Sequence, residues 1–76
     1  MSESDFQELK TRLSKNVKEL RRRNGLAQER LGFDAGVDRT LVSKIEREIA
    51  NPSLETLTKL ACQLSVTVAE LLSEDL

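Results

Sequence analysis

The chain has 76 residues, of which 38% are hydrophobic and 33% are charged, with a net charge of −1. This length suits one small domain, and the composition allows a folded core. No apolar run approaches the ~20 residues of a membrane span, and the polar, acidic start is unlike a signal peptide. A single cysteine, Cys62, excludes an intrachain disulfide and fits a reducing compartment.

The charges are unevenly distributed along the chain. Residues 10–47 hold eleven of the twelve Lys and Arg residues and five acids, a net charge of +6. Residues 48–76 carry −4 and residues 1–9 carry −3. A basic middle between acidic ends suggests a surface for a polyanion, with chance clustering of solvated charges as the alternative.

Apolar residues at helical spacing predict an all-α fold of five helices and no strand. The segment Ser4-Asp5-Phe6-Gln7 reads as a capping box that opens a helix over residues 5–23. Asn24-Gly25 ends this helix. Three arginines, residues 21–23, lie in its last turn, where they suit the negative end of the helix dipole.

Two short helices joined by a glycine-containing turn come next. The first covers about residues 28–35, and Gly36 ends it in a backbone conformation that is costly for other residues. Asp38 caps the second, over residues 39–47. This pattern over residues 28–47 predicts helix-turn-helix geometry.

Two further helices complete the predicted fold. Asn51-Pro52 breaks the chain, and Ser53 caps a fourth helix whose apolar residues point inward. These residues are Leu54, Leu57, Leu60, Ala61 and Leu64. A second capping box, residues 67–70, opens a fifth, short helix. Its apolar residues are Val68, Leu71 and Leu72.

The sequence lacks the residue sets of common catalytic and metal sites. It has no His, and its three glycines are too widely spread for a phosphate-binding loop. By periodicity, acids such as Glu46 and Glu48 lie on an exposed helix surface. Cys62 is interpreted as a partly buried small side chain rather than a reactive thiol. We therefore expect no enzyme, no metal and no cofactor.

The helix over residues 39–47 has two distinct faces. Leu41, Val42 and Ile45 share an apolar face that would hold the helix on a core. The other face carries three cations and two hydroxyls, at Arg39, Thr40, Ser43, Lys44 and Arg47. Cations reach guanine edges or phosphates, and hydroxyls bond with either. The pattern predicts a helix that reads DNA in the major groove, with an ordinary solvated helix face as the alternative.

Over Leu13–Leu72 the chain resembles the phage-repressor (Cro-like, XRE) helix-turn-helix family. The similar segments are LSKNVKELRRRNGLAQERL, AGVDRTLVSKIERE and NPSLETLTKLACQLSVTVAELL. The portion from VDRT to SKIER also looks like the controller proteins of restriction-modification systems. The resemblance implies a compact five-helix, lambda-repressor-like domain. We expect residues 1–76 to form this single domain, with residues 1–11 as an extension of the first helix.

The resemblance also implies roles for individual residues at DNA. Those expected to meet base edges are Arg39, Thr40 and Lys44. Those expected to meet the backbone are Gln28, Ser43 and Arg47, of which Gln28 would also brace the recognition helix. Asp38 caps the recognition helix, so its carboxylate is turned toward the backbone amides of that helix. Core positions fall to Val37, Val42 and Ile45.

The family usually binds palindromic sites as a two-fold dimer. Exposed apolar residues near the last helix would form the partner surface, with the monomer core as the alternative for some of them. They are Val68, Leu71, Leu72 and Leu76.

Four residues depart from the family pattern. Ala27 replaces the usual Ser or Thr cap of the first motif helix. Glu48 stands where a Gly near a phosphate is frequent, which leaves the helix end without its usual terminator. An acid at this position should also weaken affinity for the DNA backbone. Gly32 and Phe33 replace an Ala and a charged residue, and Phe33 is expected to be exposed.

The sequence therefore predicts a sequence-specific, homodimeric transcriptional regulator of double-stranded DNA. It would act on a palindromic operator as a repressor or controller protein of bacterial or phage type. We expect a cytoplasmic, nucleoid-associated protein with no membrane contact and no small-molecule ligand. Two alternatives stay open: a protein-interaction module of the same fold without DNA binding, and the antitoxin of a toxin–antitoxin pair.

Overall fold

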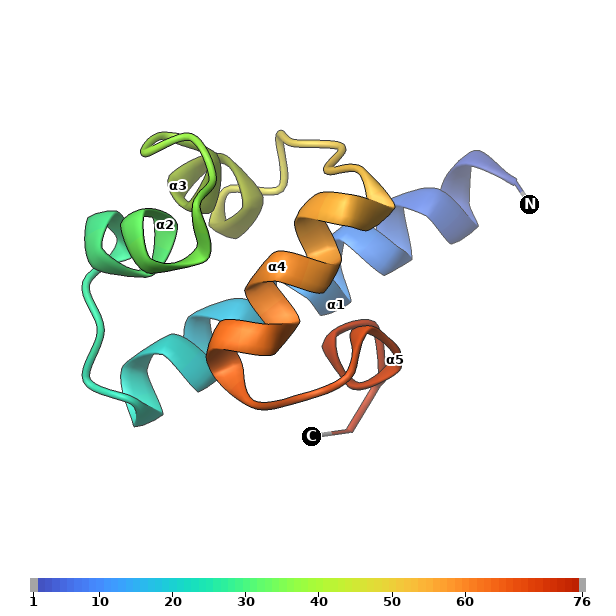
Figure 1. The fold of residues 1–76 in the computed structure, drawn as a ribbon. Helices are drawn as coiled ribbons and strands as arrows, with labels where there is room; N and C mark the ends of the chain where they lie inside the picture. The colour runs from blue at the N-terminus through green and yellow to red at the C-terminus, as the bar shows by residue number, and fades with distance from the viewer. Residues whose placement is uncertain (1, 76) are drawn as a thin grey trace.

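The computed structural model describes residues 2–75, which form five helices and no strand. The helices are α1 (Glu3–Arg23), α2 (Gln28–Ala35), α3 (Leu41–Glu46), α4 (Leu54–Leu64) and α5 (Val68–Leu71). Helix α1 packs against α3 and α5, and α2 packs against α3 and α4. Figure 1 shows α2 and α3 together at one end of the molecule and α5 at the other. The all-α, five-helix expectation is confirmed.

All five helices contribute to one apolar core. The buried residues are Leu13, Val17, Leu20, Leu31, Val42, Ile45, Leu57, Leu60, Ala61, Leu64 and Leu71. Their burial removes apolar surface from water, which is the dominant favourable contribution to folding. Val37 packs against this core from the turn after α2. The core positions expected for Val37, Val42 and Ile45 are thus observed.

Helix α1 begins two residues earlier than predicted. Its capping box is formed by Ser2 and Asp5: the Ser2 Oγ accepts from the Asp5 amide at 3.2 Å, and the Asp5 carboxylate accepts from the Ser2 amide at 3.2 Å. The prediction of a capping box at Ser4 was wrong, because Ser2 and Ser4 can each serve as the N-cap and Ser2 takes this role. Ser2 has an acid three residues later, which also suits the positive end of the helix dipole.

The turn between α2 and α3 begins as predicted and then departs. Gly36 ends α2 with a left-handed backbone, φ 71°. Helix α3 is shorter than expected, because residues 39 and 40 form a turn before it. The Asp38 carboxylate accepts from the Thr40 amide at 2.8 Å and from the Thr40 hydroxyl at 2.7 Å. Asp38 therefore holds this turn rather than capping a helix that starts at residue 39.

Glu48 ends α3 in the left-handed conformation that glycine usually supplies. Its φ is 62°, and the Ile49 amide reaches back to the Lys44 carbonyl at 3.0 Å. The Glu48 Oε1 accepts from the Thr11 hydroxyl at 2.6 Å and from the side-chain Nε2 of Gln7 at 3.1 Å. The helix therefore has a terminator without glycine, which corrects the expectation. Two contacts to α1 help offset the backbone strain.

Helices α4 and α5 have the predicted caps. The Ser53 hydroxyl accepts from the Thr56 amide, and residues 67–70 form the expected capping box. Two side chains differ from expectation. Leu54 is 71% exposed, because helical side chains tilt toward the N-terminus and this residue projects past the helix start. Cys62 is exposed, since it lies on the face of α4 opposite the core.

Candidate nucleic-acid interface

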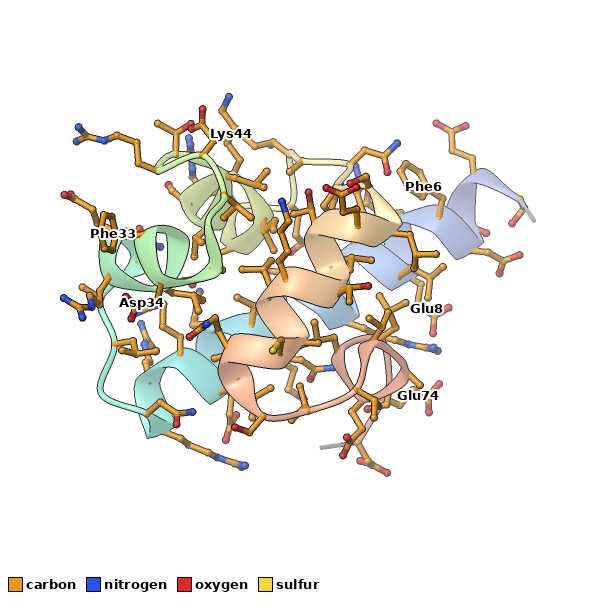
Figure 2. All side chains as sticks on the ribbon, in the orientation of Figure 1. Phe6, Glu8, Phe33, Asp34, Lys44 and Glu74 are labelled. Atoms are coloured by element: carbon orange, nitrogen blue, oxygen red, sulfur yellow. The ribbon has the colours of Figure 1, made fainter. Side chains whose placement is uncertain are left out.

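The outer face of α3 and the turn before it carries the cations and hydroxyls predicted from the sequence. Arg39, Thr40, Lys44 and Arg47 are exposed, and Ser43 is half-buried. The opposite face of α3 is anchored, since Val42 and Ile45 are 0% and 2% exposed. Figure 2 shows Lys44 at the outer edge of the molecule. The structure thus places the predicted residues on one accessible surface.

The cations of this surface have few internal partners among residues 2–75. The Arg39 guanidinium lies 3.8 Å from the Glu29 carboxylate, and both side chains are largely exposed, so the pair is weak. The Arg47 Nε donates to the Ser43 carbonyl at 3.3 Å. Lys44 forms no ion pair within the described residues. These side chains are therefore available to an external anion.

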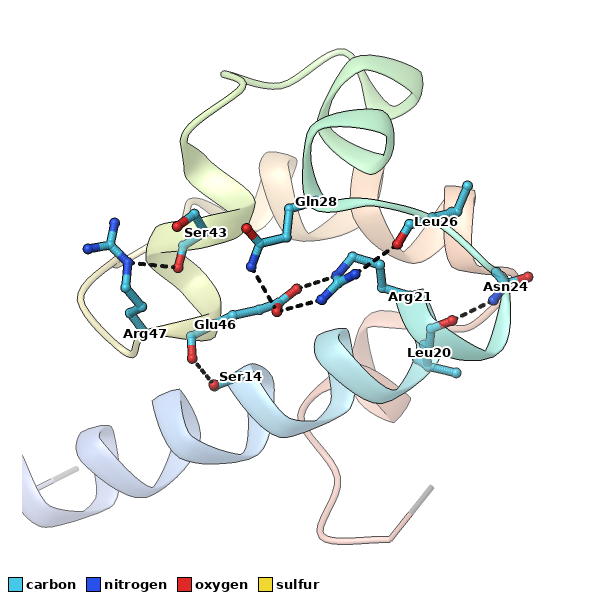
Figure 3. Close-up of polar contacts among 9 residues, drawn as sticks. All are labelled: Ser14, Leu20, Arg21, Asn24, Leu26, Gln28, Ser43, Glu46 and Arg47. Carbon is cyan, nitrogen blue, oxygen red and sulfur yellow. Dashed lines mark hydrogen bonds and ion pairs between the residues drawn. The ribbon is translucent and has the colours of Figure 1, made fainter.

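A buried ion pair fixes the end of α3 to α1 (Figure 3). The Arg21 Nε donates to the Glu46 Oε2 at 2.7 Å, and its Nη2 donates to Oε1 at 3.0 Å. The side chain of Glu46 is 3% exposed and that of Arg21 is 12% exposed. This placement contradicts the expectation of an exposed Glu46. A helical pattern around Ile45 does not reveal a partner 25 residues away.

Further hydrogen bonds extend this network to Gln28 on α2 and to the backbone carbonyls of Leu26 and Glu46. The Gln28 Nε2 donates to the Glu46 Oε1 at 3.0 Å. Arg21 also donates to the Leu26 carbonyl at 2.8 Å, and the Ser14 hydroxyl donates to the Glu46 carbonyl at 2.6 Å. Gln28 therefore holds α3 from the start of α2. Its contact with a phosphate stays a prediction.

The network keeps Glu46 ionised. Burial by itself would raise the pKa of Glu46, but hydrogen bonds from Arg21 and Gln28 and the positive charges of Arg21 and Lys18 outweigh it. The net effect lowers this pKa from its ordinary value. Hydrogen bonding to Glu46 in turn raises the pKa of Arg21. The carboxylate is thus compensated internally and presents little free negative charge beside α3.

Asp38, in the turn before α3, is another acid next to this surface, and its carboxylate is also engaged. Hydrogen bonds from the Thr40 hydroxyl and amide lower the pKa of Asp38, with a smaller contribution from the charges of Lys44 and Arg39. Because a carboxylate only accepts, the Thr40 hydroxyl must donate its proton to Asp38. With its proton donated to Asp38, the Thr40 hydroxyl has only lone pairs left, so it can accept a hydrogen bond from a ligand but not donate one.

The residues predicted for the partner surface divide into three groups. Val68 and Leu72 are half-buried and pack at the edge of the core. Leu71 is 0% exposed, so its side chain belongs to the monomer core, which corrects its assignment to an interface. Leu76 lies outside the described residues.

Sequence reasoning missed the buried polar side chains Ser14, Asn16 and Glu46. The Asn16 Nδ2 donates to the carbonyls of Leu71 and Ser73, each at 2.9 Å, and ties the end of α5 to α1. The sequence offered a signal for Ser14 alone, which lies seven residues before Arg21 and therefore on the same face of that helix.

Residues 2–75 contain no group of three His, Cys, Asp or Glu side chains that could hold a metal ion. Within the same residues, no helix is both long and apolar enough to span a bilayer.

Comparison with known proteins decides the family. The helix-turn-helix family model matches residues 17–71, more than half of the chain. The chain belongs to the helix-turn-helix family. It is 38% identical over 68 residues to Control protein C.SmaI from Serratia marcescens, covering 90% of this chain and 81% of that protein. It is 35% identical over 68 residues to Control protein C.MunI from a Mycoplasma species, covering 88% and 92%.

A solved structure shows the same fold. The crystal structure of the restriction-modification controller protein C.AhdI from Aeromonas hydrophila matches with a TM-score of 0.77 and 39% identity, covering 82% of this chain and 94% of that one. The expected fold, the family and the likeness to controller proteins are confirmed. These relatives are named control or controller proteins, and other similar proteins are named HTH-type transcriptional regulators, so the chain falls in the class of DNA-binding transcription regulators.

Proposed function

We propose that this helix-turn-helix protein is a sequence-specific regulator that binds a palindromic operator as a homodimer, as a repressor or controller protein in the cytoplasm. The observation that carries the proposal is the outer face of α3. It presents Arg39, Thr40 and Lys44 to solvent while Val42 and Ile45 anchor its inner face. The named control proteins C.SmaI and C.MunI support the same reading.

In this proposal α3 enters the major groove and its side chains meet base edges. Lys44 and Arg39 donate to guanine O6 and N7. Because Thr40 gives its proton to Asp38, its hydroxyl accepts from a base amino group, such as adenine N6 or cytosine N4. The bond that Thr40 donates to Asp38 therefore limits Thr40 to hydrogen-bond donors on the bases.

Phosphate contacts fix the position of α3 in the groove. Arg47 is exposed beside the end of α3, and Ser43 lies one turn before it. Gln28 uses one amide hydrogen on Glu46, which leaves the second for a phosphate oxygen. The buried Arg21–Glu46 pair holds α3 against α1 during this contact.

A palindromic site requires two copies of α3 about 34 Å apart, one helical turn of DNA. Val68 and Leu72, at the edge of the core on and after α5, are the proposed partner residues, because they are only half-buried in one chain. Leu72→Glu should then lower the dimer fraction in analytical ultracentrifugation and weaken operator binding.

Equilibrium binding of a DNA site to the Lys44→Ala variant tests the role of α3. Loss of this base contact should cost about 1–3 kcal/mol and relax sequence preference at one position. Lys59→Ala is the matched control, since Lys59 is an exposed lysine on α4 that pairs with Glu55 at 3.4 Å. Equal binding by the Lys44 and Lys59 variants would contradict the assignment.

One observation favours a second candidate, a protein-interaction module. Phe33 is 77% exposed on α2, and it lines a surface hollow together with Val37 and Ala27. Exposed aromatic side chains are frequent in protein interfaces. Such a module would show no saturable DNA binding, whereas a DNA-binding regulator loses affinity steeply as salt rises.

A further inference from the structure

A second group of cations lies outside the proposed reading surface, along one face of α1. Lys15, Lys18 and Arg22 follow at spacings of three and four residues, which places them in a row on that helix. We call these three residues the α1 basic stripe. Lys15 and Arg22 are exposed and Lys18 is half-buried. None of them forms an ion pair within residues 2–75.

The stripe lines an open surface groove in which cations outnumber acids. The remaining lining residues are Thr11, Ser14, Glu19, Arg23 and Glu48. Glu19 pairs with Arg23 at 2.9 Å, and Glu48 accepts from the Thr11 hydroxyl at 2.6 Å. Thr11 is neutral, so Glu48 keeps its negative charge, and the four cations of the lining against its two acids leave the groove with a net positive charge.

The groove begins where the recognition helix ends. Glu48 lies two residues after the end of α3, and Ser14 on α1 donates to the carbonyl of Glu46, the last residue of α3. From Lys15 to Arg22 the helix rises about 10 Å at 1.5 Å per residue. At 3.4 Å of axial rise per phosphate, a segment of this length that lies parallel to the duplex axis spans about three phosphates of one strand.

We infer that the α1 basic stripe binds the phosphate backbone of DNA just outside the bases read by α3. This inference rests on the proposed function. The matching partner is a rigid polyanion with charges in a row, since lysine and arginine contact phosphates without regard to sequence. The stripe adds affinity and extends the protected duplex beyond the half-site, and it adds no base preference.

The salt dependence of binding tests this inference. Log K falls as log salt rises, with a slope of about −0.9 per phosphate contact. The triple variant Lys15→Gln/Lys18→Gln/Arg22→Gln should make this slope less steep by up to about 2.7 per bound protomer. The effect requires a duplex with flanks on both sides of the selected site. On a duplex trimmed to the bases read by α3, the triple variant and the unmodified protein should bind with equal slopes.

Two further variants separate charge from folding. Lys15→Arg/Lys18→Arg/Arg22→Lys keeps the charges and should keep the slope. Lys59→Gln removes one exposed charge from α4, outside the groove, and should also leave it unchanged. Circular dichroism confirms that each variant is folded.

The outcomes are distinguishable. If the unmodified protein selects no DNA, the proposed function fails, and the inference fails with it. If the unmodified protein binds and the triple variant has the same slope on the long duplex, only the inference is overturned. If the triple variant reduced the salt dependence equally on both duplexes, the inference would also be overturned, because the contacts would then lie within the half-site.

Discussion

Replacing Arg21 by methionine should destabilise the fold strongly, because it leaves Glu46 without its main partner in a nearly closed site. The Glu46 side chain is 3% exposed, and Arg21 supplies it with two hydrogen bonds of 2.7 and 3.0 Å. Removing one partner of a buried ion pair costs about 3–5 kcal/mol. Gln28 still donates to the carboxylate, so we expect the lower end, about 3 kcal/mol.

This loss is large for a chain of this size. At about 0.05–0.15 kcal/mol per residue, the total free energy of unfolding is about 4–11 kcal/mol. A loss of about 3 kcal/mol lowers the Tm by about 12–24 °C. Urea unfolding at neutral pH, followed by far-ultraviolet circular dichroism, measures the change directly.

Arg23→Met is the matched control on the same helix. It removes the Arg23–Glu19 pair, whose side chains are 58% and 47% exposed, and should cost less than about 1 kcal/mol. The double variant Arg21→Met/Glu46→Met should recover much of the lost stability, since no buried charge is left unpaired. The reasoning is refuted if Arg21→Met and Arg23→Met cost the same.

Three other expectations follow from the structure. Because the folded-state pKa of Glu46 is lowered, its stabilisation is complete above the unfolded-state pKa and is lost as the pH falls through the folded-state value. The stability gap between Arg21→Met and the unmodified protein should therefore shrink as urea titrations are moved from neutral to acidic pH, and a constant gap would count against this account. Ala27→Ser should add about 1 kcal/mol, because Ala27 has the extended backbone of an N-cap and no side-chain cap bond; thermal unfolding would show no gain if the α2 amides were already satisfied. Glu48→Gly should be more stable than Glu48→Ala by about 1 kcal/mol, since both lose the same side-chain contacts and only alanine bears the cost of φ 62°; equal stabilities would exclude backbone strain there.

Local signals in the sequence were enough to predict most of the fold. Gly36 and the capping box at residues 67–70 each determine a helix end through their own backbone or side chains, and both are observed. The start of α1 was misplaced because Ser2 and Ser4 carry the same local signal. The exposed face of α3 was predictable, because helical periodicity separates its cations from Val42 and Ile45.

The rest of the candidate site depends on contacts between distant segments. Glu46 is buried only because Arg21 and Gln28 converge on it from two other helices. Glu48 adopts a left-handed backbone while Thr11 on α1 bonds its carboxylate. The inward position of Leu71 likewise depends on how α5 packs against α1 and α4. Periodicity within one helix contains none of this information.

Selection from random duplex DNA with the unmodified protein and Lys44→Ala in parallel tests the central claim most directly. A sequence-specific homodimer should enrich a palindromic motif, and the Lys44 variant should blur that motif at one position of each half-site. The proposal would be contradicted if the folded protein enriched no motif, or if the Lys44 variant enriched the same motif with undiminished preference.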